Sequence, residues 1–198
     1  DSATEADVVR RIDAAKQAGD TLGGEVEVIA RGLPLGLGSH VSWDRKLDGR
    51  LAGMLMSIPA VKGVEIGLGF EAARRPGSAV HDAITGQDDG APRFRRETNN
   101  AGGIEGGMTN GEPIVVRAAL KPLASLRKPL SSVHLNTKEQ LKAEIVRSDT
   151  APVAAAAVIG EAVVAIALAQ AFSEKFGGDS LRETKENFDR YVAYVRSY

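Results

Sequence analysis

The sequence lacks cysteine altogether, and its charges nearly cancel. Without cysteine the chain can form no disulfide bond, thiolate nucleophile or cysteine-based zinc site, which fits an intracellular protein. The 25 basic and 26 acidic side chains give a formal net charge of −1. Domains that bind nucleic acid usually carry a strong positive excess. We therefore expect no nucleic-acid partner, and any basic function must be local.

No secretory leader and no uninterrupted membrane span are visible in these 198 residues. The N-terminal stretch "DSATEADVVRRID" is polar and charged, and it begins without Met. The longest apolar stretch, residues 151–172, is interrupted by Glu161 and Gln170 and takes most of its bulk from alanine. This composition favours a buried helix of a soluble protein over a membrane-spanning helix. We expect a cytoplasmic protein without a membrane partner.

General motifs of catalysis are scarce. Gly36 and Gly38 do not continue as G-x-G-x-x-G after a strand, and no G-x-x-x-x-G-K-[ST] occurs, so the common nucleotide-binding loops are excluded. There is no G-x-S-x-G elbow from which a serine triad could be assembled. The three histidines, His40, His81 and His134, lack the spacing of metal ligands. We therefore expect no metal site.

The sequence does contain alternating helical and strand patterns. Apolar spacing predicts helices after Thr4, from Leu47 to Pro59, along the alanine-rich stretch, and after a capping box formed by Ser180 and Glu183. Period-two alternation predicts strands at 24–32, 61–70 and 112–122, and a hairpin formed by 133–135 and 141–146. The predicted fold class is therefore α+β.

Two of these elements also predict which side chains face inward. The strand 112–122 places four apolar residues on one face: Ile114, Val116, Ala118 and Leu120. The last helix is expected to bury Leu181, Phe188, Val192 and Val195.

The segment 69–112 has little periodicity and is rich in Gly and Arg. Five of its glycines fall between 102 and 111. Each glycine costs extra chain entropy to order, so such a cluster persists where tight turns, positive φ or the close approach of a ligand is needed. Long irregular stretches in compact domains are uncommon unless they are functional or mobile. Composition leaves both interpretations open, a surface loop or a ligand-binding loop.

Eight segments, in their order, resemble one family. They are "KQAGDTLGG" (16–24), "PLGLGS" (34–39), "LMSIPAVKGVEIGLGF" (55–70), "RRPGS" (74–78), "NNAGGIEGGMTNGEPI" (99–114), "AALKP" (118–122), "RSDT" (147–150) and "EKFGGDSLRET" (174–184). This set is similar to that of the chorismate synthases. The match runs over nearly the whole chain but covers only about the second half of a family member, because the family's N-terminal segment has no counterpart here.

The resemblance implies a fold and an activity. Family members are homotetramers of a helix-covered sandwich of two antiparallel sheets, so residues 1–198 would form the C-terminal portion, with 69–112 as its flavin-loop region. They are carbon–oxygen lyases of the shikimate pathway of aromatic amino-acid biosynthesis. They remove phosphate from 5-enolpyruvylshikimate 3-phosphate by 1,4-anti-elimination, giving chorismate, and require reduced FMN. The implied partners are this anionic substrate and the missing N-terminal half.

The resemblance also implies cofactor-binding residues. They are Pro59, Ala60, Gly106, Lys121, Pro122, Leu123, Ala124, Ser125 and Arg147. Lys121 and Ser125 offer a cation and a hydroxyl group for the FMN phosphate or the ring edge. Many relatives carry Asn or Gln at the position of Pro59, so only a contact through the backbone carbonyl survives there.

The resemblance is most specific about chemistry at residues 147–150. The family's aspartate that matches Asp149 lies near flavin N5 and is implicated in proton movement, and Arg147 contacts flavin or substrate through its planar guanidinium group. Without the resemblance, the sequence would predict only an exposed ion pair between these two residues. Beyond Thr150 the family's usual Cys-x-x-Pro is replaced by Ala151 and a displaced Pro152.

Two interpretations remain open. In the first, the chain is the C-terminal portion of an FMN-dependent lyase and is incomplete for catalysis by itself, because the catalytic histidines and several arginines belong to the absent N-terminal segment. In the second, it is a non-catalytic folding or oligomerisation fragment that retains the scaffold and weak flavin affinity.

Overall fold

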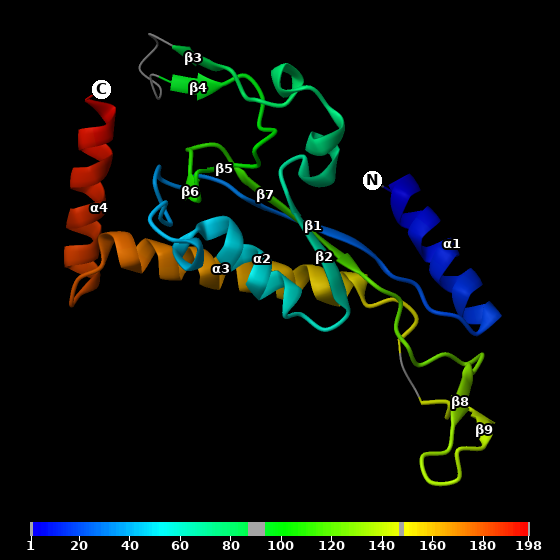
Figure 1. Cartoon of the computed structure of the whole chain (residues 1–198). Coiled ribbons are helices and arrows are strands. Elements are labelled where there is room, and N and C mark those ends of the chain that lie inside the picture. Colours follow the sequence, from blue (N-terminus) through cyan, green and yellow to red (C-terminus); the bar gives the residue numbers. More distant parts are fainter. Residues whose placement is uncertain (1, 87–93, 147–148, 198) are drawn as a thin grey trace.

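The computed structural model describes residues 2–86, 94–146 and 149–197 (Figure 1). Its elements are, in chain order, α1 (Ser2–Ala18), β1 (Gly24–Ala30), η1 (Trp43–Arg45), α2 (Leu47–Met56), β2 (Val61–Ile66), η2 (Gly69–Arg74), η3 (Gly77–Ala79), β3 (Ile84–Gly86), β4 (Phe94–Arg96), β5 (Ile104–Glu105), β6 (Met108–Thr109), β7 (Ile114–Leu120), β8 (Ser131–Val133), β9 (Gln140–Lys142), α3 (Val153–Phe176) and α4 (Leu181–Arg196). The α+β class is thereby confirmed.

A three-stranded antiparallel sheet with the order β1-β7-β2 organises the fold. β7 pairs with β1 from Gly24↔Leu120 to Ala30↔Ile114, and its other edge pairs with β2. The alternation along β7 has the predicted phase, because all four predicted inward residues are buried: Ile114, Val116, Ala118 and Leu120. β7 is therefore the central strand, and everything else is arranged around it.

The helices α2 and α3 cover one face of this sheet. At Gly160 the helix α3 faces both β1 and α2, since a Cβ there would be in ordinary contact with Val28 Cγ2 at 3.4 Å and with Leu55 Cδ2 at 3.8 Å. Contact with β1 and α2 at the same point closes the core. The largest fully buried side chains are Leu37, Leu47, Leu51, Leu55, Ile114, Val116 and Val164.

The other face of the sheet carries a chain of charges. Arg117 of β7 lies between two glutamates on the neighbouring strands, with its Nε 3.3 Å from Glu27 and its Nη1 3.4 Å from Glu65. These side chains are only partly exposed. The two faces of β7 therefore differ, one apolar and covered by helices, the other bearing ion pairs.

The irregular segment 69–112 contains the short helices η2 and η3 and two small hairpins. β3 pairs with β4, and β5 pairs with β6. A further bridge joins Gly38 to Met108. Much of the segment is thus tied into local hydrogen-bonded structure.

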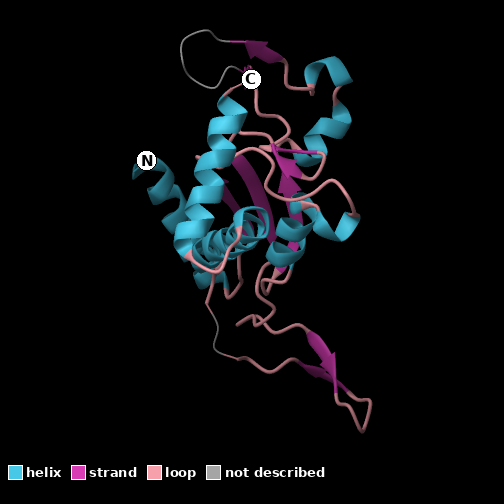
Figure 2. Cartoon of the chain, turned by 90° about the vertical axis from the view of Figure 1, so that its left-hand side faces the viewer, coloured by secondary structure: helices cyan, strands magenta, loops and turns pink. Residues whose placement is uncertain are grey.

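Two peripheral elements complete the chain. A hairpin is present where one was predicted, but its strands β8 and β9 lie at 131–133 and 140–142 rather than at 133–135 and 141–146, with pairing from Ser131↔Lys142 to Val133↔Gln140. The hairpin projects away from the rest of the molecule (Figures 1 and 2). The helix α1 stands to one side of the sheet, with Ala15 as its buried residue.

The C-terminal helix α4 begins at the predicted capping box. The Ser180 hydroxyl accepts a hydrogen bond from the Glu183 N–H at 3.3 Å. Further along, the Phe188 ring packs against those of Phe172 and Phe176 on α3, with centroids 5.5 and 5.4 Å apart. The expectation that Leu181 faces inward was wrong, since this side chain is 89% exposed. It occupies the first turn, before α4 meets α3.

Candidate functional site

Four segments meet at the end of the sheet where β7 finishes and where β1 and β2 begin. The turn between α2 and β2 lies against the end of β7, because the Lys121 N–H donates a hydrogen bond to the Ala60 carbonyl at 2.9 Å. Ala60 has a φ of 73°, a left-handed conformation that is rare for a residue with a side chain. The turn thus places its backbone beside Lys121.

Residues 20–23 fasten two further segments at the same end. The Thr21 hydroxyl donates a hydrogen bond to the Leu123 carbonyl at 2.6 Å, and the next residue, Leu22, donates its N–H to the Thr150 carbonyl at 2.8 Å. Consecutive residues therefore hold the run after β7 and the segment before α3. We call residues 20–23, 59–60, 121–125 and 149–150 the β7-end cluster.

The β7-end cluster gathers most of the residues predicted to bind the cofactor. Pro59, Ala60 and the run Lys121–Ser125 belong to it, and so does Asp149, the residue predicted to be catalytic. Pro59, Lys121 and Asp149 are exposed, so their polar groups face solvent. The prediction for Arg147 lies outside the described residues.

Gly106 is not brought to this cluster. The neighbouring Gly107 carbonyl accepts a hydrogen bond from the N–H of Leu47, the first residue of α2, at 2.9 Å. Pro59 comes after the other end of the same helix. α2 has 10 residues, and a rise of 1.5 Å per residue makes it about 15 Å long. Gly106 and Pro59 are therefore separated by roughly the length of α2.

Most glycines around Gly106 serve the backbone rather than a ligand. A Cβ on Gly102 would lie 2.3 Å from the Gly67 nitrogen, and a Cβ on Gly103 would lie 2.5 Å from the Pro113 oxygen. Gly106 differs, because its φ is 60° and an added Cβ would meet no atom within 4 Å. In the segment 99–114, which we call the glycine block, Gly106 is exposed whereas Gly102 and Gly103 are buried.

Side chains fasten the glycine block further. Asn99 bonds the Gly103 N–H with its oxygen and the Pro113 carbonyl with its nitrogen, both at 2.8 Å. Asp82 accepts the backbone N–H groups of Asn100 at 2.8 Å and Ala101 at 2.9 Å. The block is therefore a hydrogen-bonded structure, not an unsupported loop.

This arrangement also affects the pKa of the Asp82 carboxyl group. Burial opposes its ionisation, but hydrogen bonds from the Thr98 hydroxyl and from the N–H groups of Ala101 and Asn100 outweigh that effect. The pKa of Asp82 is consequently lowered from its ordinary value of 3.8. The ionised form therefore stabilises the block.

Sequence reasoning missed two residues that build the β7-end cluster. Thr21 is buried and supplies the hydroxyl that fixes Leu123. Gly23 is required by close approach, since a Cβ there would lie 2.2 Å from the Leu120 carbonyl oxygen and 3.0 Å from Pro122 Cδ. Both fall within "KQAGDTLGG", which carried part of the family resemblance but to which no structural task was assigned.

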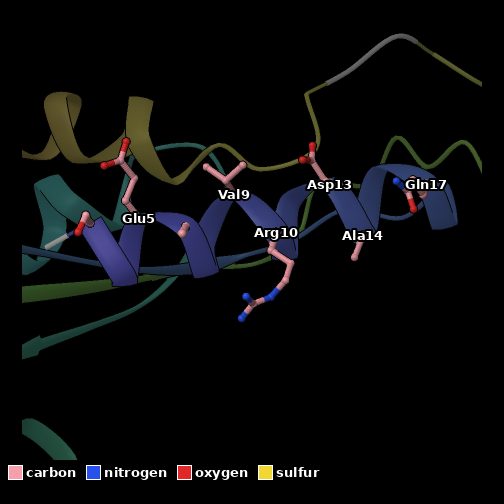
Figure 3. Close-up of a pocket in the computed structure, with 8 residues that line it drawn as sticks. Glu5, Val9, Arg10, Asp13, Ala14 and Gln17 are labelled. Carbon is pink, nitrogen blue, oxygen red and sulfur yellow. The ribbon is translucent and has the colours of Figure 1, made fainter.

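Other candidate sites are weaker. A shallow hollow along α1 is lined by eight residues that all come from that helix (Figure 3). Its side chains do not converge, since Glu5, Val9 and Asp13 point to one side of the helix and Arg10 to the other. Within 2–86, 94–146 and 149–197, no three His, Asp or Glu side chains gather as they would around a metal ion.

The fold and the cluster define an α+β unit whose exposed polar loops lie at one end of a helix-covered sheet. The family model described as chorismate synthase matches residues 1–173. The chain belongs to the chorismate synthase family.

Known members of the family show how much of it the chain represents. The chain is 60% identical to the chorismate synthase of Geobacter metallireducens over 203 residues, covering 100% of this chain and 52% of that protein. It is 57% identical to that of Thermoanaerobacter pseudethanolicus over 189 residues, covering 96% and 53%. A crystal structure of a chorismate synthase matches with a TM-score of 0.81 and 47% identity, covering 98% of this chain and 49% of that one. The chain thus spans about half the length of the curated relatives it matches.

Proposed function

We propose that a family-length protein containing these residues is a catalytically active chorismate synthase. It would eliminate phosphate from 5-enolpyruvylshikimate 3-phosphate in a 1,4-anti manner, as a carbon–oxygen lyase of the shikimate pathway in the cytoplasm. The observation that supports this most is identity of 60% over the entire chain, together with the gathering of seven family-matched flavin contacts at the β7-end cluster. Residues 1–198 would be the C-terminal portion of the catalytic domain.

The β7-end cluster has the chemical groups that FMN needs. Lys121 is an exposed cation suited to the phosphate, and Ser125 carries a hydroxyl group. Backbone groups of Pro59 and Ala60 lie beside Lys121 and can approach the polar edge of a planar ring. Pro59 has no side-chain donor, so its carbonyl group is the only contact it can offer. The residues present therefore fit the cofactor.

Gly106 would reach the same cofactor from another copy of the chain. It lies about the length of α2 away from Pro59, whereas its open surroundings leave room for a planar ligand. In the homotetramer that the family resemblance implies, a neighbouring copy could bring Gly106 to the β7-end cluster of the first.

Asp149 would carry a proton, and Arg147 would bind an anion. When bound, reduced FMN supplies electron density that assists cleavage of the allylic C–O bond. Asp149, exposed beside the Thr150 carbonyl that Leu22 holds, would carry a proton on its carboxylate during the elimination. Arg147 is proposed from the sequence alone, as a planar guanidinium group that binds the anionic ligand.

A second candidate function is favoured by the half-length match. A chain that covers 52% of its relative would lack about half of the residues around a highly anionic substrate. The isolated chain would then act as a folding or oligomerisation fragment with residual flavin affinity.

Flavin binding and turnover separate these possibilities. We expect the chain to bind reduced FMN, measured by anaerobic titration of the flavin absorbance and fluorescence, with Lys142→Gln on the projecting hairpin unchanged and Lys121→Gln weakened. Turnover is expected only after the chain is joined to the part of the Geobacter metallireducens protein that it does not match. Unchanged flavin spectra at millimolar protein would contradict cofactor binding at the cluster, and a joined protein that binds FMN but is inactive would favour the fragment.

A further inference from the structure

The turn that carries Gly106 belongs to a very short hairpin. Its strands β5 and β6 contribute two residues each. Gly106 and Gly107 form the loop between them, and both have a positive φ, of 60° and 86°. Two-residue hairpin loops of this kind favour glycine, because both central residues take left-handed conformations. A two-stranded hairpin is marginally stable at best by its own pairing, so other contacts must fix this turn.

The protein covers one side of the turn and leaves the other side open. Gly107 is buried, and a Cβ there would lie 2.5 Å from Lys46 Cγ and 2.9 Å from the Ser39 carbonyl oxygen. The Gly107 carbonyl accepts the Leu47 N–H at 2.9 Å. Gly106 is exposed, and a Cβ there would meet no atom within 4 Å. The turn therefore rests on the protein through Gly107 and presents Gly106 on its open side.

Arg96, the last residue of β4, joins the two ends of the same hairpin. Its guanidinium group pairs with the carboxylate of Glu105, the residue directly before the turn. Its Nη1 also donates a hydrogen bond to the carbonyl of Asn110, the residue directly after β6, at 3.2 Å. The Asn110 side-chain amide completes the arrangement by donating to the Glu105 carboxylate at 2.9 Å. We call Arg96, Glu105 and Asn110 the Arg96 clamp.

The Arg96 clamp is itself held from outside the hairpin. The backbone N–H of Arg96 donates to the Glu112 carboxylate at 3.1 Å, and the Glu112 N–H donates to the Asn110 side-chain oxygen at 3.0 Å. The Arg96 side chain is 17% exposed and Asn110 is 8% exposed, so these hydrogen bonds lie largely out of water and are strengthened. A planar guanidinium group with fixed donors thus sets the position of Glu105.

Holding both ends of a two-residue turn also orders the peptide groups at its tip. A ligand that contacts Gly106 then meets backbone that is already ordered, so less binding free energy is lost in ordering it. We propose that Arg96 is a positioning residue for the FMN contact at Gly106, an inference that rests on the proposed function. Arg96 acts through Glu105 and Asn110 and does not itself touch the flavin.

Loss of the planar fork tests this role in the joined, family-length protein. Arg96→Lys keeps the cation but cannot hold Glu105 and the Asn110 carbonyl together, so the dissociation constant of reduced FMN should rise about tenfold. Turnover at saturating FMN should stay within about threefold of the parent, because a binding contact is weakened. Arg95→Lys is the matched control, since it makes the same change at an exposed side chain of β4, and it should bind FMN like the parent.

Glu105→Gln keeps the test decisive if Arg96→Lys does not fold. The Glu105 side chain is 45% exposed, so the fold tolerates this change, which weakens the clamp from its other end. The dissociation constant of reduced FMN should rise about threefold, because a charge-assisted hydrogen bond becomes a neutral one. An affinity equal to that of the parent would contradict the proposal.

A double-mutant cycle separates positioning of the turn from a general weakening of the protein. Gly106→Ala places a methyl group on the open side, so it removes the contact through which Arg96 acts. In that background Arg96→Lys should raise the dissociation constant by less than about twofold, because the two changes affect one contact and are not additive. A full tenfold rise in both backgrounds would show that Arg96 acts elsewhere and would overturn the proposal.

Hydrogen exchange measures the order of the turn without flavin. In residues 1–198 alone, the amides of a peptide covering 104–110 should exchange faster in Arg96→Lys than in Arg95→Lys, because the clamp no longer holds the hairpin. Equal exchange in the two variants would contradict the proposal, since the turn would then be ordered without the clamp.

Lys121→Gln distinguishes a failure of this proposal from a failure of the proposed function. If Lys121→Gln weakens FMN binding while both clamp variants bind like the parent, the cofactor site stands and positioning by Arg96 is wrong. If the joined parent protein does not bind FMN at all, both are wrong. A lower Tm for Arg96→Lys with unchanged FMN affinity would assign Arg96 a structural role only and would also overturn the proposal.

Discussion

The glycine block and the β7-end cluster lie at opposite ends of α2, and both are held by hydrogen bonds, but close backbone packing is denser in the glycine block. In the glycine block, backbone meets backbone, with Gly102 against Gly67 and Gly103 against Pro113. In the β7-end cluster, four segments are held by a few hydrogen bonds from Thr21, Leu22 and Lys121.

The difference shows that glycine density does not by itself mark a binding loop. Both interpretations of the segment were reasonable from composition, since glycine permits close approach by a ligand and by another backbone alike. In this chain Gly102 and Gly103 meet protein atoms, whereas Gly106 faces open space. Substitutions can test this division between scaffold and site.

Gly102→Ala should have the largest effect. Its φ of 64° disfavours any side chain, and the new Cβ would lie 2.3 Å from the Gly67 nitrogen. We expect a loss of about 3 kcal/mol or more in the free energy of unfolding. Gly106→Ala, with a similar φ but open space, should lose only about 1 kcal/mol. Urea denaturation of both variants is the measurement, and equal losses would erase the distinction between the two glycines.

The next largest effect is expected for Asp149→Asn, which should lower turnover without lowering stability. Asn keeps the size of the side chain and removes the carboxylate that is proposed to carry a proton, so turnover of the joined, family-length protein should fall by about 10² to 10⁴. The assay is anaerobic, with reduced FMN and saturating substrate. Full turnover in the variant would leave Asp149 with a structural role only.

Arg147→Lys provides the contrast to Asp149→Asn. It keeps the charge but removes the planar fork, so it should raise the dissociation constant of the anionic ligand more than it lowers turnover. If both variants changed only turnover, the division of tasks between these two residues would be wrong.

Lys121→Gln should weaken FMN binding by about tenfold, because a charge-assisted hydrogen bond to the phosphate is lost. Riboflavin, which lacks the phosphate, should bind parent and variant equally. A variant that loses riboflavin as well as FMN would show that Lys121 supports the fold of the cluster rather than the phosphate.

Thr21→Val should cost about 1 kcal/mol of stability, because it removes the hydrogen bond to the Leu123 carbonyl while keeping the shape of the side chain. Thr85→Val is the matched control, since its hydroxyl contact with the Arg95 carbonyl is long, at 3.5 Å, and exposed. A control that loses as much as Thr21→Val would show that the effect is not specific to the cluster.

The smallest effect concerns pH and the glycine block. Because the folded pKa of Asp82 is lowered, its ionised form contributes stability above its ordinary pKa of 3.8, and this contribution is lost as the pH falls through the lower folded value. Asp82→Asn should therefore be less stable than the parent at neutral pH, with a difference that shrinks below pH 3.8. Thermal melting of both proteins across this range measures it, and a constant difference would contradict the assignment.

Local sequence patterns predicted the helices and strands better than they predicted which side chains are buried. The period-two alternation in 114–120 has the predicted phase because Ile114 and its neighbours must face the helices. The helical spacing at Leu181 was equally regular, yet this side chain is exposed. Periodicity shows which residues share a face, whereas burial depends on a second surface, which is formed by other parts of the sequence.

The candidate site was predictable only as far as the family resemblance extends. It placed Pro59, Ala60 and the run 121–125 in one list, and the structure brings them together. It could not show that Gly106 belongs to a different end of the molecule, since a list of contacts contains no distances. Thr21 was missed because no sequence motif marks a threonine after a turn as important. Its hydrogen-bond partner, Leu123, lies 102 residues away in the sequence.

Two consecutive residues anchor the two halves of the candidate site. Thr21 donates a hydrogen bond to the Leu123 carbonyl, and Leu22 donates one to the Thr150 carbonyl. The Cα atoms of adjacent residues lie about 3.8 Å apart, so the two anchors are one peptide unit apart. The segment that would bind a phosphate and the segment that would carry a proton are therefore attached to the same short stretch of chain.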